Sequence, residues 1–482
     1  MLSLEDYASL GAAEMARQVK AGALSPVEIV EAALTVQQSL DASLHAFCTP
    51  TPESAREAAR ALELRIRRGE AVGALAGVPV AIKDLVATKG VRTTYGSKLY
   101  EEFIPDDDDI VVERLKAADA IILGKTNASE FGYGGFGHNP VFPTTRNPWN
   151  VTLSPGGSSA GSAAAVASRM CPIAIASDGG GSIRLPASFC GLVGIKASMG
   201  RVPVWPGCRD PRFPGVSGWE SIEHIGPLAR SVADAALMLD VIAGPDPRDR
   251  LSIPVEGVDW IRAAASPTAG LGLKVAYCPD WGGVRVDRRV RALVDRAAQR
   301  FETDLACRVT IEKAPLGDFI DCFRAIVALE TDIAGLKALS SGRESDLSPS
   351  VRALLSKSWP SEAFTDAITA RKKVVQAMAQ FMTRFDLLLT PTVPATPFAI
   401  DLAGPGAIES EAVADDAWTP ALYPANLTGQ PAASVPAGWT DDGLPIGLQI
   451  VGRHLADGAV IAAAAAFETC QPWGDMRPIV SS

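Results

Sequence analysis

Two glycine-rich clusters, each containing serine, are the part of this sequence best suited to catalysis. Residues 156–162 read GGSSAGS and residues 179–182 read GGGS. Glycine adopts positive φ at little cost, so consecutive glycines can aim several backbone N–H groups at one point. Such a set of amides binds anions and can hold the oxyanion that forms when a nucleophile attacks a carbonyl. Ser182, at the end of the second cluster, is therefore a candidate nucleophile beside an oxyanion hole.

A lysine interrupts one of the most apolar stretches of the chain. Residues 77–86 read GVPVAIKDLV, which predicts a buried strand with Lys83 near its end. One interpretation is that Lys83 pairs with Asp84 or reaches solvent. The other is that its amine is buried, because burial lowers the pKa of a lysine and lets the neutral form act as a base. This stretch alone leaves both interpretations open.

A mechanism that uses both features joins Ser182 to Lys83 through a second serine. Ser182 would attack a carbonyl carbon, and its proton would pass to a neutral lysine through a hydroxyl, which can donate and accept. The four histidines lie in ordinary contexts, so a lysine base is the more economical choice. Close packing of a helix against a strand explains either glycine cluster alone, but it explains poorly both clusters together with a buried lysine.

Two other motifs match formally but lack the required context. Residues 157–161 match the Gly-x-Ser-x-Gly elbow of α/β-hydrolases, with Ser159 as nucleophile, but that elbow must follow a buried strand. Residues 150–156 read NVTLSPG, which does not predict a strand. The end of the P-loop motif matches at Gly124, but Asp119 stands where that motif needs a glycine. We therefore exclude nucleotide binding there and keep an α/β-hydrolase esterase as a remote alternative.

With their flanking residues, the two clusters resemble the signature of the amidase signature family. The resemblance covers nearly the whole chain, is weakest between about 300 and 420, and includes the separation of Ser158 and Ser182. The segments that carry it are AIKD (81–84), GKTN (124–127), EFG (130–132), GGSSAGS (156–162), SDGGGSIRLPA (177–187), GLVGIK (191–196), HIGP (224–227), GQP (429–431) and LPIGLQ (444–449).

The resemblance implies a hydrolase of carboxylic amide C–N bonds with a Ser-Ser-Lys triad. In it, Lys83 is the base, Ser158 the bridging serine, usually with a cis peptide, and Ser182 the nucleophile that is acylated. Aryl esters and carbamates suit the same machinery. Asp178 and Arg184 are expected to brace the loop rather than contact substrate. The backbone donors of the oxyanion hole would be Gly179, Gly180, Gly181 and Ser182.

The residue at position 185 bears on the branch of the family. Subunits of tRNA-dependent amidotransferases, which work with a partner and glutamine, usually carry Gln there, whereas this chain has Leu185. We therefore favour a free-standing amidase. The alternative is the glutaminase subunit of such an amidotransferase, and a non-catalytic binding protein is a remote one. The substrate-binding candidates are Gly132, Tyr133, Ser159, Trp205 and Trp219.

The elements that must position these residues indicate an α/β protein with one mixed or parallel sheet. The resemblance likewise implies a central mixed β-sheet surrounded by helices. We expect a single domain over residues 1–482, with N-terminal helices in 1–70, the signature core in 71–245, a variable helical cap in 300–420, and closing strands and a final helix in 421–475. Strands are predicted at 77–86, 120–123, 172–176, 272–277, 386–391, 432–436 and 447–452, and helices include 52–68, 162–168, 182–189, 231–243, 288–301 and 457–470.

Charge and cysteine usage narrow the remaining function classes. A net charge of −10 argues against nonspecific binding to nucleic acid or anionic membranes. The eight cysteines include no Cys-x-x-Cys pair and the four histidines are scattered, which argues against a zinc site. The first twenty residues lack the apolar core of a signal peptide. We expect a cytoplasmic enzyme with a small-molecule amide substrate, no metal and no cofactor, and its assembly is left open, with a homodimer as one option.

Overall fold

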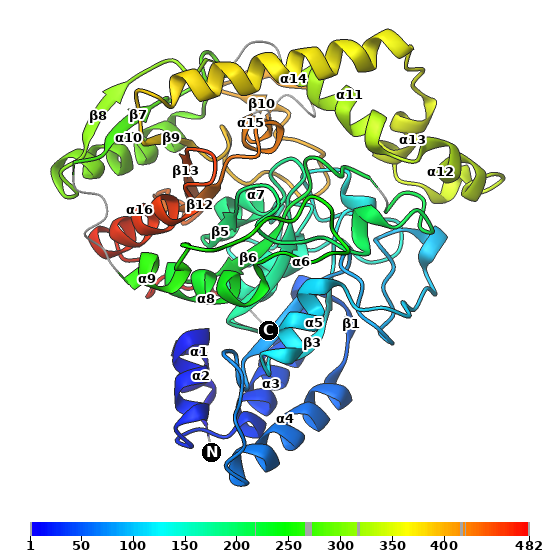
Figure 1. The fold of residues 1–482 in the computed structure, drawn as a ribbon, viewed down its shortest axis with the longest axis vertical. Coiled ribbons are helices and arrows are strands. Elements are labelled where there is room, and N and C mark those ends of the chain that lie inside the picture. The colour runs from blue at the N-terminus through cyan, green and yellow to red at the C-terminus, as the bar shows by residue number, and fades with distance from the viewer. Residues whose placement is uncertain are drawn as a thin grey trace.

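An 11-stranded mixed β-sheet forms the centre of the molecule (Figure 1). The computed structural model describes residues 2–216, 218–265, 272–315, 319–414, 418–419 and 421–480, so parts of the expected 300–420 cap lie outside the described residues. The strand order is β1-β3-β2-β4-β6-β5-β12-β13-β9-β7-β8. The strands are β1 (Phe47–Pro50), β2 (Pro79–Lys83), β3 (Ile121–Thr126), β4 (Ile173–Ser177), β5 (Val193–Lys196), β6 (Ile225–Ala229), β7 (Lys274–Tyr277), β8 (Arg308–Ile311), β9 (Leu387–Pro391), β12 (Ala432–Trp439) and β13 (Pro445–Gly452). The predicted fold class is confirmed.

The strands that carry the candidate site run parallel in the middle of one half of the sheet. β2 lies between β3 and β4 and is parallel to both, with Val80 opposite Ile122 on one side and Ile173 on the other. Every residue of β2 and β4 is buried. Strands covered on both faces consist of continuous apolar runs, which explains why these two were readable from the sequence. Because parallel strands end at the same edge, Lys83 and Ser177 come together there.

Helices pack around this sheet (Figure 1). They are α1 (Leu4–Ser9), α2 (Ala12–Lys20), α3 (Pro26–Leu44), α4 (Pro52–Arg67), α5 (Ile110–Ala117), α6 (Ala160–Ala167), α7 (Arg184–Cys190), α8 (Val232–Ile242), α9 (Trp260–Ala265), α10 (Arg288–Thr303), α11 (Ile320–Glu330), α12 (Ile333–Leu339), α13 (Pro349–Ser356), α14 (Ser361–Phe381), α15 (Tyr423–Leu427) and α16 (Asp457–Cys470). The final helix has the predicted bounds. A short ribbon of β10 (Ala407–Ile408) and β11 (Glu411–Ala412) lies apart from the sheet.

The first glycine cluster leads into α6, and the second joins β4 to α7. All residues of α6 are buried, and most are alanine or glycine, so the helix can pack closely against β4 and α7. A Cβ atom at Gly161 would lie 2.2 Å from the carbonyl oxygen of Ala46, so glycine is required there. This close packing fixes both serine clusters relative to the end of β4.

The helices between residues 319 and 381 form a layer at the end of the molecule away from α1–α4 (Figure 1). Phe323 on α11 and Val374 on α14 lie in one hydrophobic cluster. The layer is also held by polar contacts: Glu130 accepts a hydrogen bond from the N–H of Ser348 at 2.6 Å, and Glu330 accepts one from the N–H of Ser221 at 2.9 Å. The division of the chain into four parts stays a prediction.

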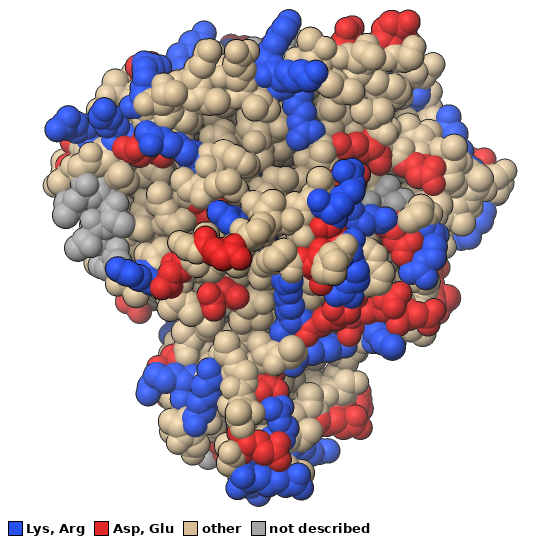
Figure 2. Space-filling model, in the orientation of Figure 1, with Lys and Arg blue, Asp and Glu red and all other residues tan. Residues whose placement is uncertain are grey.

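Charged side chains of both signs are interspersed on the face shown in Figure 2. In the described part of the chain, no helix is long and apolar enough to cross a membrane. The same residues include no group of three or more His, Cys, Asp or Glu side chains that could hold a metal ion.

Two strands near the centre of the sheet were not predicted as strands. β6, which reads IGPLA, lies between β4 and β5, and β5 reads VGIK. Glycine and proline are depleted in strands, so both segments stand out in the sequence as motifs rather than as strands. The helix predicted at 182–189 begins later, at Arg184. The preceding residues form a loop whose backbone N–H groups are held by Asp178.

Candidate active site

Lys83 is the last residue of β2, and its side chain is 0% exposed. Its Nζ donates to Ser158 Oγ at 2.8 Å and to Ser177 Oγ at 2.9 Å, and lies 3.3 Å from the Ser177 carbonyl oxygen. The neighbouring Asp84 instead accepts hydrogen bonds from the N–H and hydroxyl of Thr94, at 3.0 and 2.6 Å. The interpretation in which Lys83 pairs with Asp84 or reaches solvent is therefore wrong.

The surroundings of Lys83 make its amine easy to deprotonate. Burial lowers its pKa to about 8, while the negative charges of Glu223 and Asp178 act in the opposite direction. A general base works best when its pKa lies near the working pH, because it can then both take and return a proton. Lys83 therefore has the electrostatic environment of a base.

Ser158 is 1% exposed and lies just before α6. The peptide bond between Gly157 and Ser158 is cis, as the resemblance implied for the bridging serine. A Cβ atom at Gly157 would lie 2.3 Å from the carbonyl oxygen of Phe136, so no larger residue fits. The Ser158 hydroxyl is thus held at a fixed point beside the amine of Lys83.

Ser182 lies in the loop between β4 and α7 and lines a cavity of about 610 Å³. Gly157 and Gly180 line the same cavity. Gly157, which precedes the bridging Ser158, and the candidate nucleophile Ser182 therefore line the same cavity. A carbonyl group bound in this cavity would lie next to Ser182.

One of the four expected oxyanion donors has another partner. The N–H of Gly181 donates to Asp178 Oδ1 at 2.6 Å, so it is directed at that carboxylate. Gly180 lines the cavity beside Ser182, whereas a Cβ atom at Gly179 would meet Trp219 at 2.4 Å. The backbone amides of Gly179, Gly180 and Ser182 remain the candidate donors.

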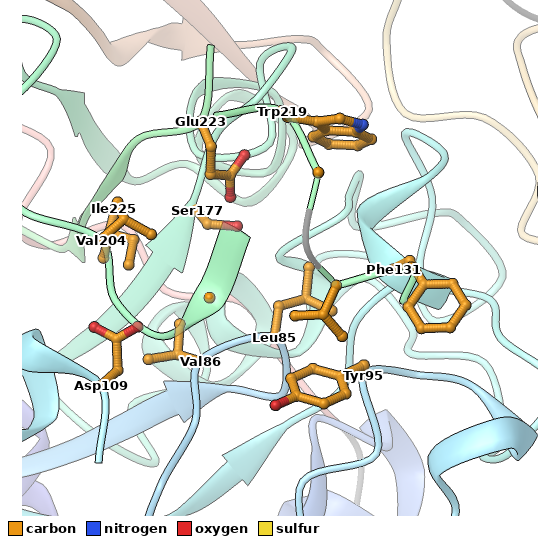
Figure 3. A pocket seen from close by; sticks show the side chains of 14 residues that line it. Leu85, Val86, Tyr95, Asp109, Phe131, Ser177, Val204, Trp219, Glu223 and Ile225 are labelled. Carbon is orange, nitrogen blue, oxygen red and sulfur yellow. The ribbon is translucent and has the colours of Figure 1, made fainter. Parts of the chain in front are cut away.

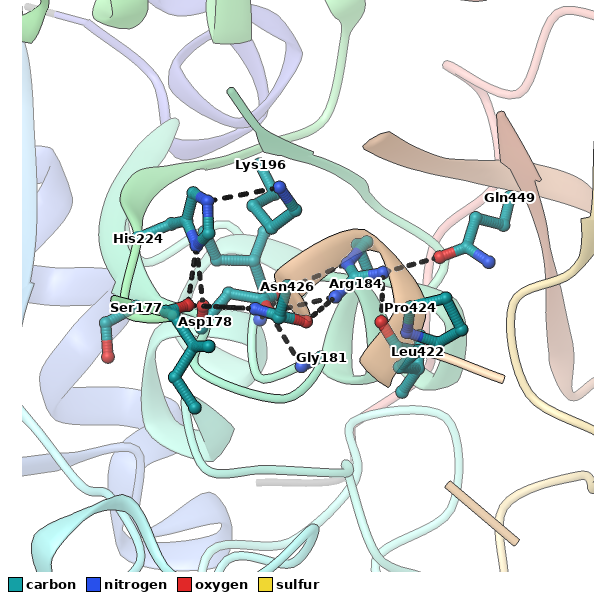
Figure 4. Close-up of polar contacts among 12 residues, drawn as sticks. Ser177, Asp178, Gly181, Arg184, Lys196, His224, Leu422, Pro424, Asn426 and Gln449 are labelled. Atoms are coloured by element: carbon teal, nitrogen blue, oxygen red, sulfur yellow. Dashed lines mark hydrogen bonds and ion pairs between the residues drawn. The ribbon is translucent and has the colours of Figure 1, made fainter. Parts of the chain in front are cut away.

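A buried ion pair between Asp178 and Arg184 stabilises the loop that carries Ser182 (Figure 4). Asp178 and Arg184 are both 0% exposed, and Arg184 donates to Asp178 through Nε and Nη2, each at 2.9 Å. Arg184 also donates to Asn426 Oδ1 and Gln449 Oε1, each at 2.7 Å. Burial raises the pKa of Asp178, but the charge and hydrogen bonds of Arg184 outweigh it and hold that pKa far below its usual range. The loop is therefore anchored to α15 and β13 by this buried ion pair.

Among the described residues, seven aromatic side chains line the cavity. They are Tyr133, Phe136, Trp219, Phe323, Trp359, Trp418 and Tyr423. Of the substrate-binding candidates, Gly132, Tyr133 and Trp219 line the cavity. Ser159 and Trp205 are not among the residues that line it. The Ser159 hydroxyl donates to the Ser177 carbonyl oxygen at 3.2 Å, and the guanidinium carbon of Arg248 lies 4.9 Å from the centroid of the Trp205 ring.

Residues 28–461 match the family model described as Amidase. The chain belongs to the amidase signature family. A curated relative from Prochlorococcus marinus (strain MIT 9303), one of the subunits of a glutamyl-tRNA(Gln) amidotransferase, is 36% identical over 97% of this chain and 99% of its own. Family enzymes of this kind act on amide C–N bonds, and this coarser part of the predicted function is supported.

Solved structures of family members superpose on the whole chain. A bacterial aryl acylamidase of the amidase signature family gives a TM-score of 0.89 at 33% identity, covering 97% of both chains. The corresponding glutamyl-tRNA(Gln) amidotransferase chain of Thermotoga maritima gives 0.76 at 28% identity, covering 100% of this chain and 98% of that one. The curated relatives match the glutaminase subunit, our alternative, better than the free-standing amidase that Leu185 favoured.

Several residues of this amidase site were missed in the sequence. Ser177 and Glu223 both act on Lys83. Ser177 is the first residue of the motif at 177–187, and Glu223 comes one residue before the motif at 224–227. The alignment of β4 with β6, which sets Ser177 opposite Ile225, would have placed Glu223 near the site. Phe323 and Lys357 line the cavity from the region where the family resemblance is weakest, so no motif marks them.

Proposed function

We propose that this protein hydrolyses carboxylic amides through an acyl-enzyme on Ser182. The observation that carries the proposal is the 2.8 Å contact between the buried Nζ of Lys83 and Ser158 Oγ, next to Gly157, which lines the same cavity as Ser182. A dry amine with a pKa of about 8 next to a hydroxyl is suited to remove a proton. Structural packing alone does not need that arrangement.

In the proposed acylation, neutral Lys83 accepts the hydroxyl proton of Ser158 while Ser158 accepts that of Ser182. Ser182 Oγ bonds to the carbonyl carbon, and the carbonyl π electrons move onto oxygen, where backbone N–H groups stabilise the negative charge. When the tetrahedral intermediate collapses, the C–N bond breaks. The leaving nitrogen takes its proton from Ser158, which recovers one from Lys83.

In the proposed deacylation, water takes the place of Ser182 as the nucleophile. Its proton passes through Ser158 to Lys83 as its oxygen attacks the acyl carbon. The proton then returns to Ser182 Oγ as the acyl–oxygen bond breaks, which releases the carboxylic acid and restores the enzyme. These steps use only side chains and backbone amides of this chain.

The cavity supports a substrate with a bulky apolar group and no positive charge. A volume of about 610 Å³ suits a drug-sized molecule, and the aromatic walls favour flat apolar groups. Among the described residues that line it, none carries a carboxylate, whereas Arg324 and Lys357 are cationic. Arg324 pairs with Asp321 at 3.2 Å, and Lys357 lies 3.8 Å from the ring centroid of Trp359. An ammonium group on the substrate would find no counter-charge in this lining.

The second candidate function is that of the glutaminase subunit of an amidotransferase. The identity of 36% to the Prochlorococcus protein over nearly both full chains favours it. Glutamine carries an ammonium and a carboxylate, and a glutaminase needs groups for both. The cationic lining with Arg324 and Lys357 supplies one of these, and Leu185 at the cavity wall is apolar. Because no carboxylate of the described residues lines the cavity to bind the ammonium group of glutamine, we favour hydrolysis of an apolar amide.

A hydrolysis screen over aryl amides, aliphatic amides, carbamates and free glutamine tests the two candidates. The proposal expects turnover of apolar amides by the purified chain and none by Ser182→Ala. Turnover of glutamine alone, or activity that appears only after a copurifying partner is added, supports the amidotransferase function instead. Light scattering on the same sample separates a monomer or homodimer from a larger complex.

A cytoplasmic location belongs to the same proposal. Buried cysteines such as Cys171 and Cys190 carry free thiols, which supports a reducing compartment. Fractionation of the native host followed by immunodetection tests it, and recovery of the protein outside the cytoplasm would contradict it.

A further inference from the structure

Lys83 has a second hydroxyl partner that the proposed reaction does not use. Ser177, the last residue of β4, is 3% exposed, and its Oγ accepts a hydrogen bond from Lys83 Nζ at 2.9 Å. A hydroxyl that accepts one hydrogen bond still has its own proton to donate. Ser177 can therefore connect the lysine to an acceptor on its far side.

Glu223 is that acceptor. β6 runs antiparallel to β4 with Ile225 opposite Ser177, which puts Glu223 just past the end of β4. Figure 3 shows the Glu223 carboxylate close to Ser177 at one end of a small cavity of about 40 Å³. Burial raises the pKa of Glu223 to about 7, although the charge of Lys83 and a hydrogen bond from Ser177 favour its charged form. The other carboxylate oxygen, Oε2, is buried without a hydrogen-bond partner among the described residues.

We propose that Glu223 is a positioning residue of the amide hydrolysis proposed above: acting through Ser177, its carboxylate sets how tightly Lys83 holds its proton. A buried amine without a nearby negative charge loses its proton at low pH and becomes a weak base. The Glu223 charge offsets part of this effect of burial. Lys83 then keeps enough basicity to draw the proton from Ser158 and can still return it to the leaving group.

The other charges around this pair have partners of their own. The charges of Glu223 and Asp178 act on Lys83, and those of Lys83, Asp178 and Arg209 act on Glu223. Asp178 is paired with Arg184 at 2.9 Å, and Arg209 with Asp249 at 3.0 Å. Glu223 forms no salt bridge within 4.0 Å among the described residues, so no ion-paired cation neutralises its charged form.

The test is the pH dependence of Ser182 labelling by a fluorophosphonate in the full-length protein. Glu223→Gln removes the negative charge, and Glu223→Asp keeps it on a shorter side chain. Ser177→Ala removes the hydroxyl that connects Lys83 to Glu223. Glu468→Gln is a matched control, because Glu468 is also largely buried, with a pKa raised by burial to about 7, yet is absent from the charges that act on Lys83. Circular dichroism and thermal unfolding report the fold of each variant.

Glu223→Gln should move the midpoint of the acid limb down by about one pH unit or more, the effect of one nearby charge. It should also lower the plateau rate, because a less basic lysine removes a proton more slowly. Ser177→Ala should move the midpoint in the same direction, Glu223→Asp should restore most of the wild-type profile, and Glu468→Gln should match the wild type.

An unchanged midpoint in folded Glu223→Gln would overturn the inference. If that variant does not fold, an unchanged midpoint in Ser177→Ala would do the same. Failure of the proposed function looks different, because the wild type itself would then show no labelling of Ser182 at any pH.

Discussion

Replacing Asp178 by Asn should destabilise the loop that carries Ser182. Oδ1 accepts hydrogen bonds from the Gly181 N–H at 2.6 Å, from Arg184 at 2.9 Å and from Asn426 at 2.9 Å, and Oδ2 accepts from Arg184 at 2.9 Å and the Ile183 N–H at 3.2 Å. Asn replaces one carboxylate oxygen by an NH₂ group. In either orientation of the amide, this NH₂ group would face at least two of the hydrogen-bond donors that now contact Asp178. It also leaves the buried guanidinium of Arg184 without its counter-charge. Removing one partner of a buried ion pair costs about 3–5 kcal/mol.

Urea unfolding at constant pH measures the loss of unfolding free energy. The control is Asp304→Asn, which removes an exposed partner of Arg300 on α10 and should leave the unfolding curve unchanged within error. Labelling of Ser182 should also slow in Asp178→Asn, because Gly181 and Ile183 flank the nucleophile. A loss of stability below about 1 kcal/mol, with normal labelling, would refute the role we assign to the pair.

Further predictions concern the base and the cavity. Burial lowers the pKa of Lys83 to about 8, so the neutral fraction rises with pH and labelling should increase about tenfold from pH 6 to 7 and level off above 8; a flat profile would contradict a lysine base. Lys83→Arg should show no measurable turnover, because guanidinium stays protonated, and a wild-type rate would exclude a neutral base. Lys357→Glu should lower kcat/KM for an aryl amide that bears a distal carboxylate about tenfold relative to kcat/KM for its neutral analogue. An unchanged ratio of the two kcat/KM values would contradict a role of the cationic lining in binding substrate. Gly157→Ala should cost about 1–3 kcal/mol in unfolding and reduce labelling, since its Cβ would lie 2.3 Å from the Phe136 carbonyl oxygen; normal stability would show that the loop adapts.

The sequence was most informative where a residue type conflicts with its surroundings. For Lys83, the apolar run left a paired or exposed amine and a buried amine both open, and the structure places the amine in the interior, because strands of this kind are covered on both faces. The cap of α3 is equally local: Ser25 accepts a hydrogen bond from the backbone N–H of Val27 at 3.1 Å, and serine followed by proline is a common start of a helix. Features of this kind depend on a few neighbouring residues and can be read directly.

Features that depend on pairing between distant segments could not be read this way. Glu223 reaches the surroundings of Lys83 only because β6 inserts between β4 and β5, and the glycine and proline of β6 hide its strand character. Gly181 looked like an oxyanion donor from its cluster, but its N–H is taken by Asp178 across the loop. Trp205 lies near the core motifs in the sequence, yet it packs under Arg248 instead of lining the cavity.

The identity of the acylated residue tests the central claim most directly. Peptide mass spectrometry after fluorophosphonate treatment at pH 8 should locate one adduct on Ser182 in the wild type. The adduct should be absent in Ser182→Ala and should form far more slowly in Lys83→Ala and Ser158→Ala, which lack the 2.8 Å contact between base and bridging hydroxyl. An adduct on Ser159, or a wild-type labelling rate in Lys83→Ala, would contradict the proposed mechanism.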